Sequence, residues 1–173
     1  LKSPPFRSYV VSLHLALNGF WAQRVIIGWL AWEMTGSAGF VGLVAFLNFF
    51  PTLFVSPLFG VFADRIDVRK GSILSYALAG ILSALFAGLC IFGSPTPVLL
   101  ALFSFVTGVI SSANHPMRMS LTPRLAPASD LPSVVAITSL NFNMSRLTGP
   151  AIGGILIQTC LLYTSPSPRD LST

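Results

Sequence analysis

Long apolar runs separated by short polar segments dominate this chain, and five of the runs are long enough to cross a lipid bilayer as helices. A hydrocarbon layer of about 30 Å needs about 20 helical residues at a rise of about 1.5 Å each. The pattern therefore predicts an all-α, polytopic membrane protein. The expected transmembrane spans are residues 9–34, 40–62, 72–92, 98–119 and 131–158.

The segments outside these spans are short. Residues 1–8 are expected to be a cytoplasmic N-terminal segment, followed by one transmembrane bundle over residues 9–158. From Cys160 the chain reads CLLYTSPSPRDLST, which is polar, rich in Ser and Pro, and unlike the preceding span. We expect residues 159–173 to be a non-native tail, with a genuine short polar tail as the alternative. We also expect the native protein to continue beyond both ends of this sequence.

Composition excludes several classes of protein. Only 9% of the residues are charged and 53% are hydrophobic, whereas soluble domains carry about 25% charged residues. The net charge of +5 is spread over short loops without interleaved aromatic residues, so no nucleic-acid partner is expected. The two cysteines have no metal or redox spacing, and no metalloprotease, hydrolase or phosphate-loop motif occurs. We therefore predict no metal, no cofactor and no enzymatic activity.

Lysine and arginine occur in the loops on one side of the predicted bundle. The opposite loops, near Gly36 and Pro95, contain neither residue. Because cytoplasmic loops of membrane proteins are enriched in Lys and Arg, the N-terminus is expected in the cytoplasm. The basic loop residues are Lys2, Arg7, Arg65, Arg69, Lys70, Arg118 and Arg124.

Polar residues in the fourth span share one helical face of about 100° at about 100° per residue. They are Ser104, Thr107, Gly108, Ser111, His115 and Arg118. One interpretation is a water-lined translocation path, because polar residues in membranes usually face a cavity. The other is close helix packing, since small residues let two backbones approach. His115 and Arg118 favour the path.

The fifth span has a similar face, formed by Ser139, Asn143, Arg146, Pro150 and Gly153. Inserting a guanidinium at the centre of a helix costs about 2.5–3.5 kcal/mol. Arg146 must therefore contact water, a carbonyl, another part of the protein or an anionic substrate. Pro150 removes one backbone donor and loosens the helix. The spacing of Gly149 and Gly153 favours close helix contact.

The first two spans also contain polar residues. His14 and Asn18 lie one helical turn apart, and Arg24 lies on a neighbouring part of the surface. His14 is most simply a hydrogen-bonded packing residue, while Asn18 and Arg24 are candidates for the translocation path. Asn48 and Thr52 show the same one-turn spacing in the second span.

The segment GVFADR at residues 60–65, followed by Arg69 and Lys70, resembles the loop between helices two and three of the major facilitator superfamily. The sequences WAQR at residues 21–24, TGS at 35–37 and RLTGP at 146–150, with Gly153 and Gly154, are similar to the enterobactin-exporter-like branch of that superfamily. That branch is also described as transmembrane secretion effectors. Asp67 departs from the pattern because a Gly is usual there, and we expect it to alter the turn.

The resemblance implies an incomplete six-helix N-terminal half of a carrier that works by alternating access in the bacterial inner membrane. Such a carrier exports drugs, siderophores or similar small molecules, driven by an ion gradient in which the proton is the expected coupling ion. The implied partners are the lipid bilayer, an unidentified small-molecule substrate and the C-terminal half of the same protein. The 173 residues alone are expected to be inactive.

The resemblance also implies two sets of functional residues. A conformational-switch loop, in which Asp64 contacts the other half, comprises Gly60, Asp64, Arg65, Arg69 and Lys70. The translocation path and helix-five motif comprise Asn18, Arg24, Ser111, His115, Asn143, Arg146, Gly149, Pro150, Gly153 and Gly154. The alternative function is a five-helix membrane scaffold or assembly subunit that transports nothing.

Overall fold

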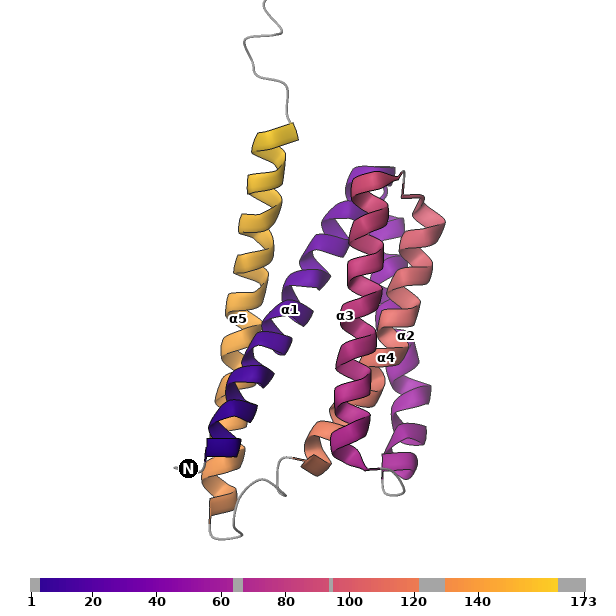
Figure 1. Ribbon diagram of the computed structural model, residues 1–173. Coiled ribbons are helices and arrows are strands. Elements are labelled where there is room, and N and C mark those ends of the chain that lie inside the picture. Colours follow the sequence, from indigo (N-terminus) through magenta and orange to yellow (C-terminus); the bar gives the residue numbers. More distant parts are fainter. Residues whose placement is uncertain (1–3, 64–66, 94, 122–129, 165–173) are drawn as a thin grey trace, which may run out of the picture.

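The computed structural model describes residues 4–63, 67–93, 95–121 and 130–164. These residues form five long helices and no strand, which confirms the predicted all-α class and the order of the elements (Figure 1). The helices are α1 (Pro4–Thr35), α2 (Ala38–Ala63), α3 (Val68–Phe92), α4 (Pro97–Leu121) and α5 (Leu131–Thr164).

All five helices extend beyond the predicted spans, and α1 and α5 extend furthest. α1 begins at Pro4 rather than at residue 9, because proline is well tolerated in the first turn of a helix. α5 continues to Thr164 rather than ending at residue 158. The next proline is Pro166, and the residue before a proline disfavours helical geometry. That residues 159–173 are non-native stays a prediction.

The short connections between helices contain the expected capping residues. Gly36 adopts a positive φ of 60°, a left-handed conformation that glycine accepts without steric cost and that commonly ends helices. The Ser37 hydroxyl then accepts a hydrogen bond from the Phe40 amide at 3.3 Å. Thr96 caps α4 in the same way, accepting from the Leu99 amide at 3.3 Å. Gly36 and Ser37 thus allow the chain to reverse direction directly between α1 and α2.

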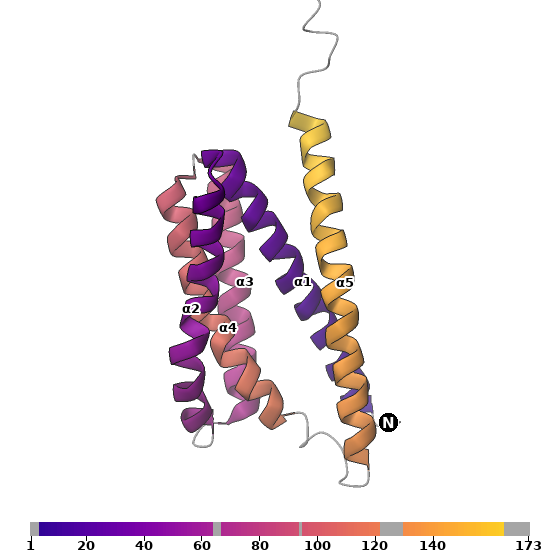
Figure 2. The same cartoon turned by 180° about the vertical axis from the view of Figure 1, so that it is seen from behind.

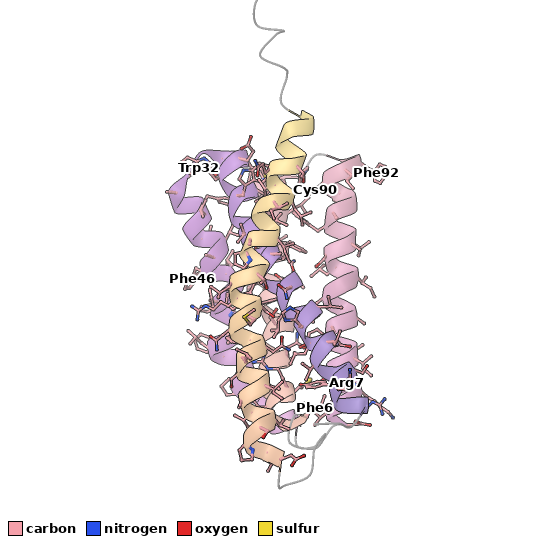
Figure 3. All side chains as sticks on the ribbon, turned by 90° about the vertical axis from the view of Figure 1, so that its left-hand side faces the viewer. Phe6, Arg7, Trp32, Phe46, Cys90 and Phe92 are labelled. Atoms are coloured by element: carbon pink, nitrogen blue, oxygen red, sulfur yellow. The ribbon has the colours of Figure 1, made fainter. Side chains whose placement is uncertain are left out.

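Four helices are long and apolar enough to span a membrane by length and composition, namely α1 to α4. Among the described residues, α5 is not one of these four helices. Large apolar side chains on the outside of the bundle are exposed, including Phe92 at 91% and Leu53 at 72%. Figure 3 shows Phe92 pointing away from the helices. The chain is thus a multi-pass membrane protein whose apolar surface faces lipid.

The helices form two groups that α1 connects. α2, α3 and α4 lie side by side, and α1 runs obliquely from the lower part of α5 to the upper end of that group (Figures 1 and 2). An apolar cluster holds this upper end together, and its buried members are Ile27, Ala31, Val44, Leu100 and Phe103. Phe86 of α3 stacks on Phe103 of α4 at 4.2 Å between ring centroids. The lower end contains a cavity of about 570 Å³ between α1 and α3.

α2 and α4 approach closely at Gly108. A β-carbon at this position would collide with the backbone carbonyl of Asn48. The Asn48 side chain donates hydrogen bonds to the Ser104 carbonyl at 3.2 Å and to the Thr107 hydroxyl at 3.1 Å. Small residues and one amide therefore join these two helices, as is typical of helix packing in membranes.

α1 and α5 run parallel and pack with equally little space between them. A β-carbon on Gly149 would lie 2.5 Å from the Trp21 β-carbon, and one on Gly153 would lie 2.9 Å from the Ala22 carbonyl. The close helix contact expected for this glycine pair is present. Gly154, the next residue, has no atom within 4 Å of such a position.

Hydrogen bonds extend this contact toward the N-terminal end of both helices. We call this row the polar seam; it consists of His14, Asn18, Asn141, Ser145 and Thr148. His14 Nδ1 lies 2.6 Å from the Asn141 Oδ1 and 3.0 Å from the Ser145 hydroxyl. The Asn18 amide donates to Ser145 at 3.3 Å, and the Thr148 hydroxyl donates to Asn18 at 2.6 Å. His14 and Asn18 are four residues apart, as are their partners Asn141 and Ser145. The seam therefore fixes the register of α1 relative to α5.

The seam also determines the tautomer of His14. The Asn141 amide nitrogen donates to the Val10 carbonyl at 3.1 Å. The Oδ1 atom of Asn141 is therefore the group that faces His14, and it can only accept a hydrogen bond. His14 consequently carries its proton on Nδ1, in agreement with its interpretation as a packing residue.

We expect Gly149→Ala to lower the free energy of unfolding by about 1–3 kcal/mol, because the added methyl group overpacks the contact with Trp21. Gly154→Ala is the matched control and should be neutral or stabilise by up to about 1 kcal/mol, since it fills open space in a helix. Reversible unfolding in mixed detergent micelles measures both. Equal effects of the two substitutions would contradict the packing described here.

Asn18→Ala should destabilise the fold by about 0.6–1.7 kcal/mol, the range found for hydrogen bonds between membrane helices. Asn143→Ala is the control, because within the described residues the exposed Asn143 amide donates to Ser139 of its own helix, at 2.9 Å, and to no other helix. The control should change stability by no more than a few tenths of a kcal/mol, in the range of exposed substitutions. The same unfolding assay measures both variants. A larger loss of stability in Asn143→Ala than in Asn18→Ala would refute a stabilising role of the seam.

Candidate functional site

A cavity of about 260 Å³ lies among the helices, with most of its wall formed by α1, α2 and α4. We call it the arginine cavity. It is concave and mainly apolar with a few polar groups, as small-molecule sites usually are. Its lining residues are Ala16, Leu17, Phe20, Trp21, Arg24, Asn48, Phe49, Thr52, Tyr76, Ser111, Asn114, Arg118 and Phe142.

Helical periodicity explains why each helix contributes residues from a single face to the cavity lining. Leu17, Trp21 and Arg24 follow one another at spacings of three and four residues on α1, so they share a face. Ser111 and Arg118 are separated by seven residues, or two turns, on α4. Each helix thus presents one stripe of aromatic and polar side chains to the cavity.

Arg24 is half-buried and surrounded by aromatic rings. Its guanidinium carbon lies 3.7 Å from the Phe49 ring centroid, 5.1 Å from that of Phe20 and 5.5 Å from that of Trp21. A cation–π contact contributes about 0.5–2 kcal/mol, whereas a guanidinium within the membrane costs about 2.5–3.5 kcal/mol. The ring contacts offset much of this cost, but they leave the planar N–H donors of Arg24 for water or a ligand.

Arg118 approaches the cavity from α4. Its guanidinium carbon lies 5.2 Å from the ring centroid of Phe142 on α5. Phe142 in turn meets Trp21 edge to face, with 6.0 Å between centroids. Arg24, Trp21, Phe142 and Arg118 therefore form a continuous row in which two cations lie at the ends and two rings lie between them.

Further polar groups surround this row. The Asn114 Oδ1 accepts a hydrogen bond from the Ser75 hydroxyl, so its amide N–H groups remain as donors. The indole N–H of Trp21 is buried and has no hydrogen-bond partner among the described residues. In the same part of the chain, no three potential metal ligands lie together. The cavity is thus rich in hydrogen-bond donors.

The polar face predicted for the fourth span divides between the two interpretations. Ser104, Thr107 and Gly108 are buried in the contact with α2, which is close packing. Ser111 and Arg118 line the arginine cavity, and their place in a translocation path stays a prediction. His115 belongs to α4, but its side chain lies outside the described residues.

The candidate residues on α1 and α5 also lie in different surroundings. Arg24 lines the cavity, whereas Asn18 is buried in the polar seam. On α5, Asn143 is exposed, and Arg146 is exposed with its guanidinium carbon 5.6 Å from the Trp21 ring. The helix-five motif is divided as well: Gly149 and Gly153 pack on α1, Pro150 is half-buried, and Gly154 faces open space.

Several lining residues were not singled out from the sequence. Phe20, Phe49, Tyr76 and Phe142 are aromatic residues in apolar helices, and hydropathy does not distinguish a ring that faces a cavity from one that faces lipid. The available signal was the spacing of Phe20 and Phe142 relative to neighbouring polar residues.

The switch loop is described only in part. Gly60 lies in the last turn of α2, and Arg69 and Lys70 are exposed in the first turn of α3. Asp64 and Arg65 lie outside the described residues. Asp67 is the N-cap of α3, and its Oδ1 accepts from the amides of Arg69 at 3.0 Å and Lys70 at 3.4 Å. The acid found where Gly is usual therefore starts a helix, a role that the sequence prediction missed.

Asp67→Ala should destabilise the start of α3 by about 0.5–2 kcal/mol, because it removes an N-cap next to two cations. Asp67→Asn keeps the capping geometry and should recover most of that loss. Amide hydrogen exchange at Arg69 and Lys70 measures the effect locally. Unchanged exchange in the Ala variant would contradict the capping role.

Comparisons with known proteins agree with this architecture. The family described as transmembrane secretion effector matches residues 1–162. The chain is 25% identical over 159 residues to the staphyloferrin A transporter of Staphylococcus aureus, covering 90% of this chain and 39% of that protein. It is 32% identical over 133 residues to the enterobactin exporter EntS of Citrobacter koseri, covering 75% of this chain and 28% of that protein.

A third relative is the multidrug efflux pump Tap of Mycobacterium tuberculosis, which is 27% identical over 166 residues, covering 91% of this chain and 39% of the pump. No solved structure matches the chain. The chain spans about 39% of the length of the first of these relatives. With the matched family, these relatives show that this multi-pass membrane chain belongs to the transmembrane secretion effector family of the major facilitator superfamily.

Proposed function

We propose that this chain forms the N-terminal helical wall of a secondary active efflux carrier that works by alternating access. The observation that carries the proposal is the arginine cavity, which places two guanidinium groups among aromatic rings inside a membrane bundle. The names of the relatives, two exporters or efflux pumps and one siderophore transporter, support export. Since the chain spans under half of these relatives, the opposite wall belongs to residues beyond it.

Alternating access requires parts that move as rigid units, and this chain has two tightly packed helix pairs. α1 and α5 share the polar seam and the glycine contact, while α2 and α4 share the Asn48 contact. The cavity wall lies between the pairs, so a small movement of one against the other changes the shape of the cavity.

We further propose that Gly60, Asp64, Arg65, Arg69 and Lys70 form the switch that contacts the C-terminal half of the carrier. Support comes from the exposure of Arg69 and Lys70 at the same end of the bundle as the N-terminus (Figure 1). The role of Asp64 rests on the resemblance of its loop to that of the superfamily.

The N-terminus and this loop are proposed to face the cytoplasm of a bacterial cell, with the carrier in the inner membrane. The uneven distribution of Lys and Arg among the loops supports this orientation. The coupling ion is proposed to be the proton. The group that binds the proton is proposed to be His14, His115, Glu33 at the end of the first span, or a residue beyond this chain, because none of the cavity-lining residues is acidic.

The gene that encodes this chain, expressed at full length in an efflux-deficient bacterium, should lower the accumulation of at least one member of a dye panel. A protonophore should abolish the effect, and the 173-residue chain alone should produce none. Asp64→Asn should slow efflux about 2- to 30-fold, the factor given by a helix-end carboxylate contact of about 0.3–2 kcal/mol.

Asp67→Asn is the matched control, because it makes the same chemical change three residues away and retains an N-cap residue. It should leave the efflux rate within about twofold, since Asn and Asp are nearly equal as N-caps. Efflux that is equal in the Asp64 variant and the unaltered carrier would exclude the switch role. Dye accumulation that the full-length protein never lowers would favour a membrane scaffold without transport.

A further inference from the structure

We infer that the arginine cavity binds organic anions with a flat aromatic body, such as aromatic carboxylates, and that it disfavours cationic amphipaths. This inference rests on the proposed function and names the class of substrate for the same site. It is carried by the charges of the lining residues, by the occupation of the aromatic faces and by the geometry of the row between the two arginines.

The charge balance of the cavity is wholly positive. Arg24 and Arg118 line it, and its lining residues include no acid. The acids in the described part of the chain lie at helix ends: Glu33 near the end of α1, Asp67 before α3 and Asp130 before α5. A guanidinium favours carboxylates through two parallel hydrogen bonds, so an anion gains most from this wall.

The aromatic rings of the cavity are already in contact with cations. The Arg24 guanidinium lies 3.7 Å from the Phe49 centroid and also contacts Phe20 and Trp21, while Arg118 lies 5.2 Å from the Phe142 centroid. A cationic ligand that stacks on a ring face already in contact with a guanidinium would have to displace that guanidinium. It would also be repelled by the two arginines at close range. These rings are therefore a less favourable site for a cation than rings without an arginine beside them.

The row of contacts indicates how an anion would lie. Arg24 is 5.5 Å from the Trp21 centroid, Trp21 is 6.0 Å from Phe142, and Phe142 is 5.2 Å from Arg118. Because Trp21 and Phe142 meet edge to face, a flat apolar body that packs on the face of one ring lies near the guanidinium at that end of the row. The volume of about 260 Å³ lies near the lower end of the usual range of about 300–1,000 Å³ for ligand pockets. It suits a body of one or two fused rings.

The test compares two probes that share one aromatic body, the anion 2-naphthoate and the cation 2-naphthylmethylammonium. The full-length protein that contains this chain is placed in phosphatidylcholine nanodiscs. Equilibrium dialysis measures the binding of each probe, and empty nanodiscs correct for partition into lipid. We expect naphthoate to bind at least about tenfold more tightly, since a charged hydrogen bond contributes about 1.5–3 kcal/mol.

Arg24→Gln and Arg118→Gln, on two different helices, should each weaken naphthoate binding about 10- to 100-fold. Arg24→Lys should recover part of the loss, because it restores the charge without the planar, bidentate group. Arg7→Gln is the matched control: it removes the same charge from an exposed position outside the cavity (Figure 3), so binding should be unchanged.

Equal binding of the two probes, preference for the ammonium, or an equal loss in the Arg7 variant would each overturn the inference. If an arginine variant fails to fold, as judged by its helical circular dichroism, the ratio of the two probes on the unaltered protein still decides. Loss of naphthoate binding when phosphatidylglycerol replaces phosphatidylcholine would assign the cavity to a lipid headgroup and overturn a soluble substrate.

The binding result separates this inference from the proposed function. Naphthoate binding with the expected arginine dependence, together with no dye efflux by the full-length protein, would keep the anion site and reject transport. Efflux of cationic dyes without preferential naphthoate binding would keep transport and reject the anion site.

Discussion

A hydrocarbon layer has no water with which to pair a buried polar group, and the arrangement of these helices follows from that constraint. Each polar side chain within a helix must find its partner on the same helix, on a neighbouring helix or in a cavity. Between α1 and α5, hydrogen bonds join His14 and Asn18 to Ser145. Asn48 finds a carbonyl and a hydroxyl on α4. The same two helix pairs also contain the close glycine contacts.

Hydrogen bonds between helices also require close approach, because short polar side chains reach each other only when the two backbones nearly touch. Gly108 lies against Asn48, and Gly149 lies against Trp21. In each pair the glycine lies against the backbone of a hydrogen-bonded asparagine, Asn48 for Gly108 and Asn18 for Gly149. Apolar packing alone would not select these partners, since lipid tails are as apolar as the leucines and phenylalanines of the bundle.

The two arginines of the cavity are compensated mainly by aromatic rings rather than by the hydrogen bonds described above. Arg24 is partly compensated by three aromatic rings, and Arg118 by one ring together with other contacts. The Arg24 guanidinium, stacked on rings, retains N–H donors at its edge, and these donors require water or an anion. The cavity is therefore the place where a charged group among the helices needs a partner other than a ring.

The five helices and the all-α class, like the close contact at Gly149 and Gly153, were predictable from the sequence, because hydropathy and residue spacing are properties of one continuous segment. Tertiary structure alone decided which polar residues serve packing and which line the cavity. Thr107 and Ser111 share a face of α4, yet one is buried against Asn48 and the other reaches the cavity. His14 and Asn141 meet across 127 positions of sequence. Such partners depend on the placement of a second helix, which no pattern along the first helix contains.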